Sequence, residues 1–151
     1  MTDKAIVYND DLRGCTRCYA TLCIYHDDMP PDEISYLLDC TPDRIVLKGE
    51  KLLLGRAEAS ANGWFIGSDG EFDSSKDIAR HIDFLAHIIR YQFDELQNLK
   101  QQGARIVISC FWGSAYGNGG PFVDSRVIEL LHKMGASLEF DVWMEEEVNP
   151  S

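Results

Sequence analysis

The sequence predicts an α+β fold, a two-layer sandwich in which helices pack on one face of a largely antiparallel sheet. Several short segments alternate apolar and polar residues, which is the pattern of strands with one buried face. Others repeat apolar residues at every third or fourth position, which is the pattern of helices. Because the strands have one mixed face, they do not fit a doubly wound sheet that is buried on both sides. The predicted order is β-α-β-β-α-β-α-β, loosely ferredoxin-like.

Five strands are predicted from this alternation and from their bounding turns. They cover residues 18–25, 44–48, 64–66, 105–112 and 138–145. The last strand alternates most clearly, with Leu138, Phe140 and Val142 on one face. Residues 1–14 fit either a tail or an edge strand, and residues 51–61 fit either a strand or a loop.

Three helices are predicted, over residues 31–40, 74–103 and 127–134. The middle one is the longest, and its apolar stripe consists of Ile78, Ile82, Leu85, Ile89, Phe93, Leu96 and Leu99. Ser74 and Asp77 fit a capping box at its start, and Gly103 fits a left-handed cap at its end. A helix with one apolar stripe must lie on another layer, and the strands provide it.

Length and charge limit the functions that the chain can have. Its 151 residues fit a single α+β domain over residues 1–151 with one core. The formal charge is −11, from 25 acidic and 14 basic residues. This charge makes a nucleic acid a poor partner, because phosphates would be repelled, so no nucleic-acid partner is expected and a basic protein is favoured. The alternative is that the charge only keeps the protein soluble.

The location predicted from the sequence is the cytoplasm. No apolar run approaches the roughly 18 residues that cross a bilayer, and the start of the chain lacks the pattern of a signal peptide. A membrane partner is therefore not expected. The cysteines are odd in number and scattered, which predicts reduced thiols and no disulfide. They are Cys15, Cys18, Cys23, Cys40 and Cys110.

Several longer stretches carry a resemblance to a known family. They are the strand over residues 19–25 leading into PPDEISYLLDCTPDRIVLKGE, Trp64 with the long helix, and the stretches SCFWGS, GNGG and LEFDVW. In these stretches the chain resembles the bacterial domain-of-unknown-function family 4279, although Trp143 stands where that family favours tyrosine. The resemblance implies a fold of this order in a bacterial cytosol, and it implies no catalytic residues.

The motifs that usually carry chemistry are incomplete in this chain. Cys15 and Cys18 form a CxxC that precedes a strand rather than opening a helix, and no second ligand pair completes a zinc site. Asp69, Glu71 and Asp73 lack the spacing of a calcium loop, and their negative charge suits the start of the long helix. No catalytic residue, metal or cofactor is therefore predicted.

A glycine-rich loop over residues 113–120 follows a strand and precedes a helix, where phosphate-binding loops lie. It has neither the spacing of a dinucleotide fingerprint nor the ending of a P-loop, so a turn is preferred. Trp112 and Tyr116 flank the loop and are candidate partner-binding residues, because aromatic side chains supply contact area at low entropic cost.

The sheet face that points away from the helices is the main candidate site. The predicted register gathers aromatic and acidic side chains there, a combination that suits lysine and arginine side chains of a protein partner. The predicted residues on this face are Tyr19, Tyr25, Phe111, Glu139, Asp141 and Trp143. Three alternatives are that residues 51–61, the N-terminus or a second copy of the chain covers it.

The leading hypothesis is a non-enzymatic module that binds a basic protein, in its sharpest form an immunity protein that blocks a toxin. One alternative is a small enzyme or ligand-binding domain with a cleft of carboxylates and histidines. Its candidates are Asp69, Glu71, Asp73, His26 and His81. Another alternative is a structural homodimer joined through the open sheet face.

Overall fold

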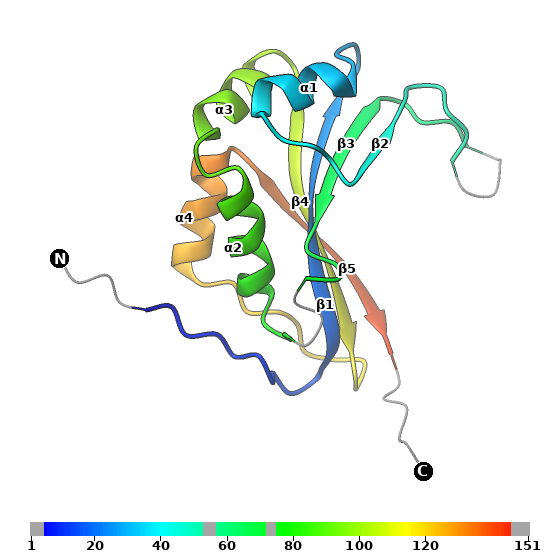
Figure 1. Ribbon diagram of the computed structural model, residues 1–151. Helices are drawn as coiled ribbons and strands as arrows, with labels where there is room; N and C mark the ends of the chain where they lie inside the picture. The colour runs from blue at the N-terminus through cyan, green and yellow to red at the C-terminus, as the bar shows by residue number, and fades with distance from the viewer. Residues whose placement is uncertain (1–4, 53–56, 72–74, 146–151) are drawn as a thin grey trace.

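The described part of the chain forms one open sheet of five strands with four helices (Figure 1). The structure is a computed structural model and describes residues 5–52, 57–71 and 75–145. The strands are β1 (Cys15–His26), β2 (Arg44–Val46), β3 (Asn62–Gly67), β4 (Arg105–Ser114) and β5 (Ser137–Met144). Their order is β2-β3-β1-β4-β5, and within this sheet only β4 and β5 are parallel neighbours. The predicted α+β class and largely antiparallel sheet are confirmed.

The first four strands have the order and directions of a ferredoxin-like sheet. β3 lies between β1 and β2 and runs antiparallel to both, and β4 runs antiparallel to β1 on its other side. Helix α4 (Ser125–Met134) then leads to β5, which pairs in parallel with β4. β5 is therefore an added edge strand. All five predicted strands are present, with ends that differ from the prediction by at most three residues.

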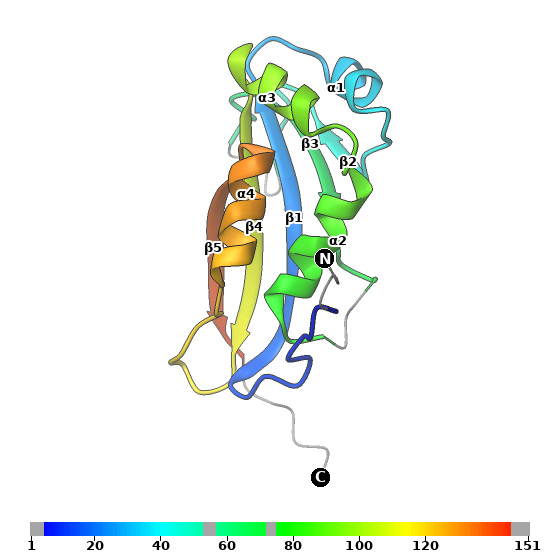
Figure 2. The same ribbon diagram turned by 90° about the vertical axis from the view of Figure 1, so that its left-hand side faces the viewer.

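The helices lie together on one side of the sheet (Figure 1, Figure 2). Besides α4 they are α1 (Pro31–Leu38), α2 (Ile78–Ile88) and α3 (Phe93–Gln101). Figure 2 looks onto this layer and shows α2 and α4 in front of the strands, with α1 and α3 toward the upper end. None of the four described helices lies on the opposite face of the sheet. Within the described ranges, no helix has the length and apolar character needed to span a bilayer.

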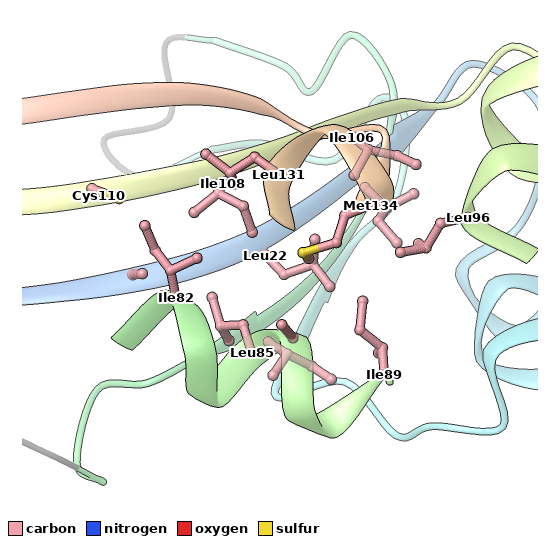
Figure 3. Close-up of a cluster of buried hydrophobic side chains, with 14 of the residues drawn as sticks. Leu22, Ile82, Leu85, Ile89, Leu96, Ile106, Ile108, Cys110, Leu131 and Met134 are labelled. Carbon is pink, nitrogen blue, oxygen red and sulfur yellow. The ribbon is translucent and has the colours of Figure 1, made fainter. Parts of the chain in front are cut away.

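The core lies between the helix layer and the inner face of the sheet (Figure 3). Side chains of the helices meet those of β1 and β4 there. The helix layer contributes Leu85 of α2, Leu96 of α3 and Met134 of α4, and the strands contribute Leu22 of β1 and Ile108 of β4. Burying one such side chain stabilises the fold by about 1.5–3 kcal/mol. The inner face of the sheet is thus occupied by packing, so a binding function falls to the outer face, the edges or the loops.

The single long helix predicted over residues 74–103 is wrong, because the chain forms α2 and α3 with a turn between them. Ile89 and Gln92 leave helical geometry, with ψ angles of 22° and 19°. The apolar stripe nevertheless continues through the turn, since Ile89 is itself buried. Consecutive isoleucines and Tyr91 also have weaker helix propensity than alanine or leucine, which makes the break less costly.

The two ends of this helical region agree in part with the predicted caps. Asp77 caps α2, because its Oδ1 accepts a hydrogen bond from the Ala79 N–H at 3.0 Å. Ser74 lies outside the described residues. Gly103 has a φ of 99°, a left-handed conformation that glycine adopts without steric cost. The chain can therefore turn directly from α3 into β4.

The structure shows the conformation of the described residues in the two segments that fitted more than one element, residues 1–14 and 51–61. Residues 5–14 form neither a strand nor a free tail: the Asn9 N–H donates to Asp77 Oδ2 at 2.8 Å, which holds them against the start of α2. The described residues of 51–61 extend the β2–β3 hairpin, because Lys51 and Glu58 form an isolated β-bridge. This hairpin projects away from the helix layer at the β2 side of the sheet (Figure 1).

β5 is confirmed as a strand, but its apolar residues are not buried as a strand covered by helices requires. Phe140 is 40% exposed, Val142 53% and Met144 71%. These residues do point to the helix side, since they pair with the buried Cys110, Trp112 and Ser114 of β4. Their exposure follows from the place of β5 at the sheet edge.

Candidate functional site

The face of the sheet opposite the helices, here called the open face, gathers six of the eight predicted partner-binding residues. Tyr19 and Tyr25 lie on β1, Phe111 on β4, and Glu139, Asp141 and Trp143 on β5. Tyr19 is the register partner of Phe111, and Phe111 is the register partner of Asp141. Register partners share a face, so these three side chains stand side by side across the sheet.

Two exposed carboxylates stand at the β5 side of the open face. Glu139 Oε1 accepts a hydrogen bond from the Ser109 hydroxyl at 3.3 Å, and Asp141 Oδ1 accepts one from the Trp143 indole N–H at 2.7 Å. Neither carboxylate forms an ion pair with a described residue. Neutral donors thus orient both groups and leave their charge available to a cation.

Aromatic rings form the floor beside these carboxylates. The rings of Tyr19 and Phe111 are stacked, with centroids 5.1 Å apart and planes 7° apart. Tyr25 meets Phe65 of β3 edge to face, with centroids 5.6 Å apart. The open face therefore offers flat, half-buried apolar area in its centre and negative charge at one side.

Two arginines that no sequence pattern singled out also lie over this floor. The Arg17 guanidinium is 4.7 Å from the centroid of the Phe111 ring, and the Arg44 guanidinium is 4.3 Å from that of Phe65. Arg17 has the strand parity of Tyr19, so the alternation of β1 indicated its side. Arg44 lies in a three-residue strand, whose period is too short to predict a face.

The cationic groups at the border of the open face are mostly paired within the chain. Arg17 Nη2 lies 3.0 Å from Glu145 Oε1, and Arg105 Nη1 lies 3.4 Å from Asp27 Oδ1. The Thr16 hydroxyl also donates to Glu145, at 2.7 Å. The hydrogen bonds from Arg17 and, to a smaller extent, from Thr16 lower the pKa of the Glu145 carboxyl.

The open face is hollowed by three open pockets of about 280, 370 and 230 Å³. Arg44 and Phe65 line all three, and Tyr25 lines the first and the third. Sites for small molecules are usually deeper clefts that bury most of their ligand. Several adjoining hollows instead suit side chains that project from a protein surface.

Trp112 and Tyr116, the other two predicted residues, do not join the open face. Trp112 points to the helix side, is only 2% exposed, and has an indole N–H with no hydrogen-bond partner among the described residues. Strand alternation explains this, because its neighbour Phe111 points the other way. Tyr116 lies in the glycine-rich loop and is exposed.

The glycine-rich loop has the geometry of a turn rather than of a phosphate site. Gly117 and Gly119 have φ angles of 72° and 78°, and the Ser114 hydroxyl donates to the Asn118 carbonyl at 2.9 Å. The helix that follows is capped by Asp124, whose carboxylate accepts from a backbone N–H where a phosphate would otherwise bind. A bound phosphate would be repelled by this carboxylate.

The two histidines of the alternative site are structural. His26 Nε2 donates to the Gln102 carbonyl at 2.8 Å, while its Nδ1 accepts from backbone N–H groups of the next loop. His81 is fully buried between Ser68 and Ser75, at 2.7 Å from the Ser68 hydroxyl and 3.0 Å from the Ser75 carbonyl. Both ring nitrogens of each histidine are engaged, and neither histidine lines the pocket that Asp69 and Glu71 line.

The acidic loop, which is the segment that contains Asp69, Glu71 and Asp73, has its described residues at the edge of the open face. Asp69 and Glu71 line the pocket of about 370 Å³ together with Asp43, whereas Asp73 lies outside the described residues. In the ranges that the structure describes, no group of three or more histidine, cysteine or acidic side chains is arranged to hold a metal ion. These carboxylates instead add to the negative charge at the border of the open face.

The CxxC pair lies inside β1 rather than before it. A bulge between Cys15 and Cys18 turns both side chains to the core, where each is at most 2% exposed. Their mutual hydrogen bond lowers the pKa of the Cys15 thiol and, with burial, raises that of Cys18. All five cysteines are free thiols, and the burial of this pair removes it from solvent oxidants.

Tyr25 is expected to stay protonated well above neutral pH. Burial, followed by Cys23 and Glu139, raises its pKa from 10.0 to about 12. Because folding raises this pKa, the protonated Tyr25 side chain stabilises the folded state. This contribution to the free energy of unfolding is complete below pH 10 and is lost as the pH approaches 12. A difference titration at 295 nm between the wild type and Tyr25→Phe should show the missing ionisation near pH 12, and a missing ionisation near pH 10 would contradict it.

These features define a class of protein: an open α+β sandwich that presents an uncovered sheet face with aromatic and carboxylate side chains. The chain belongs to the family described as Domain of unknown function (DUF4279), which it matches over residues 16–145. The family resemblance in the sequence is thereby confirmed, and it covers nearly all of the described chain. Neither the curated proteins nor the solved structures contain a significant match.

Proposed function

We propose that this protein is a non-enzymatic binding module whose open face holds a basic protein. The proposal rests mainly on Glu139 and Asp141, two exposed carboxylates that lie beside aromatic rings and form no ion pair with a described residue. The charge of −11 adds a long-range attraction that steers a cationic partner toward the chain.

Arg17 illustrates how a partner's arginine would bind. Its guanidinium lies over the Phe111 ring and pairs with the Glu145 carboxylate, so one cation uses a ring and a carboxylate together. A partner's side chain finds a similar combination at Tyr19 and Asp141, the two register neighbours of Phe111. The apolar stem of the side chain would cover the ring while its charge reaches the carboxylate.

The most specific form of the proposal is an immunity protein in the bacterial cytoplasm that blocks a basic toxin such as a nuclease. A nuclease needs a basic surface to bind phosphates, and an acidic surface with aromatic rings suits the same groups. Cells that express the toxin encoded beside this chain should grow when the chain is co-expressed. Failure of the chain to protect them would count against the immunity role while leaving other basic partners open to the pull-down below.

The binding role is tested by an affinity pull-down from the native cell extract, with bound proteins identified by mass spectrometry. We expect a basic protein that is retained at low salt and released at high salt, because exposed charges are screened. The triple variant Glu139→Lys, Asp141→Lys, Trp143→Ala should not retain it. Recovery of this chain alone would contradict the proposal and favour the homodimer.

A matched control separates the open face from overall charge. Asp94 and Glu129 are exposed acidic residues on α3 and α4, in the helix layer. The double variant Asp94→Lys, Glu129→Lys changes the net charge as much as Glu139→Lys with Asp141→Lys does. It should retain the basic protein, and equal loss in both double variants would show that location on the open face does not matter.

A further inference from the structure

β5 leaves one edge of its backbone without a partner. It is the outermost strand, and no described residue pairs with its outer side. The Glu145 N–H donates to the Ser114 carbonyl of β4 at 2.9 Å, so the backbone groups of residue 145 point toward β4. Backbone groups alternate along a strand, so those of every second residue point outward. The outward set is Leu138, Phe140, Val142 and Met144.

The two sides of this free edge differ in chemistry. Three members of the outward set, Phe140, Val142 and Met144, have exposed apolar side chains on the helix side of the sheet, whereas Leu138 is partly buried. Glu139 and Asp141 lie on the other side, within the open face, and Trp143 is 58% exposed beside them. A strand that paired here would therefore meet apolar groups on one face and carboxylates on the other.

The sheet protects its two edges unequally. β2, at the opposite edge, has only three residues, and short edge strands offer little to a pairing chain. β5 has eight residues and contains no lysine, arginine, proline or glycine, the residues that commonly blunt or bend an edge. Its only charged residues are Glu139 and Asp141, which disfavour pairing with an acidic strand but not with a basic one, so this long edge is one to which a basic partner strand can add.

A second copy of the chain is a poor occupant of this edge. Antiparallel pairing of two β5 strands about Phe140 would place Glu139 opposite Asp141 of the other copy. Pairing about Asp141 would place Asp141 opposite itself. Like charges directly opposite each other destabilise a strand pair, so β5 repels itself on its open-face side.

We propose that β5 accepts an extended strand of the basic partner as a sixth strand of the sheet. The partner strand alternates cationic residues, opposite Glu139 and Asp141, with apolar residues opposite Phe140 and Val142. Backbone hydrogen bonds to the outward set would supply affinity, and the alternation would supply selectivity. The basic character of the partner rests on the proposed function, whereas the pairing rests on the β5 edge itself.

Synthetic peptides test the pairing without knowledge of the partner. The probe is an eight-residue, capped and fluorescently labelled peptide of alternating arginine and valine, and the control alternates glutamate and valine. Fluorescence anisotropy should show binding of the first probe and at least about tenfold weaker binding of the second, because its charges meet like charges. Equal affinities, or no binding of either peptide, would overturn the inference.

Methylated probes separate strand addition from simple charge attraction. Methylating the amide nitrogens of one alternate set, either the valines or the arginines, removes the N–H groups that face β5, whereas methylating the other set does not. One methylated probe should therefore bind at least about tenfold more weakly than the other. Equal binding of both would show that no strand is formed.

Variants of the chain give a second, independent readout. Val142→Pro removes an outward N–H and leaves the ladder to β4 intact, a place where an edge strand tolerates proline. The proline variant should bind the probe about tenfold more weakly than the wild type. If the proline variant does not fold, Val142→Lys replaces it: this variant keeps the backbone N–H but loses the apolar contact with the probe and adds a positive charge beside it, so it should also bind the arginine–valine probe more weakly. Unchanged probe affinity in a folded Val142→Pro chain would overturn the inference. If that chain still captures the basic protein from extract, the proposed function stands without strand addition.

Discussion

Reversing both open-face charges on β5, with Glu139→Lys and Asp141→Lys, is expected to weaken binding of the basic partner about 100-fold. Two attractions are lost and two repulsions gained, at roughly 0.7 kcal/mol for each exposed charge pair. Both side chains are exposed and held only by neutral donors, so the exchange should leave the fold unchanged. Isothermal titration of the wild type and the variant with the recovered partner measures the ratio.

Salt gives this prediction an internal check. At about 1 M salt the screening length falls to about 3 Å, so the difference between wild type and variant should shrink to a few-fold. The helix-layer variant Asp94→Lys, Glu129→Lys should bind like the wild type at both salt concentrations. If the β5 variant lost less than about threefold in affinity at low salt, Glu139 and Asp141 would not be part of the binding surface.

Replacing Trp64 with alanine should have the largest effect on stability, about 3–5 kcal/mol of the free energy of unfolding. Trp64 is fully buried on β3, and its indole N–H donates to the Ser35 hydroxyl of α1 at 3.0 Å. The variant therefore opens a cavity between α1 and the sheet and leaves the half-buried Ser35 hydroxyl with one partner fewer. Urea unfolding followed by circular dichroism measures the change.

The tryptophan on the open face provides the contrasting case. Trp143→Ala should change the free energy of unfolding by no more than about 0.5 kcal/mol, because the side chain is largely exposed. It should instead weaken partner binding, as exposed tryptophans at interfaces often do. If Trp143→Ala destabilised the fold as much as Trp64→Ala, its side chain would be a structural element rather than part of a binding surface.

The strands were predictable from sequence because each has a period of two over enough residues. β1 and β4 alternate buried and less buried positions over most of their length, which fixes both the strand and the face of Tyr19 and Phe111. The same rule puts Trp112 on the inner face. The place of Trp112 beside the glycine-rich loop suggests a partner contact, but the alternation of β4 correctly predicts that its side chain points to the core.

Features that depend on three-dimensional neighbours were not predictable. The turn at Ile89 keeps the apolar stripe of the two helices continuous, so no sequence period reveals it. The exposure of Phe140 and Val142 follows from the position of β5 at the sheet edge, which pairing order decides and residue pattern does not. The clearest alternation in the chain thus belongs to its least covered strand.

Hydroxyl-radical footprinting of the chain, alone and with the recovered basic partner, tests most directly whether the open face is the binding surface. Mass spectrometry reports the solvent access of each aromatic side chain. Tyr36 and Tyr91 are 84% and 82% exposed on the helix layer and serve as internal references for Trp143. Binding at the open face predicts that the partner lowers oxidation of Tyr19, Phe111 and Trp143 and leaves the references unchanged. Protection of Tyr36 and Tyr91, with Trp143 oxidised as before, would contradict it.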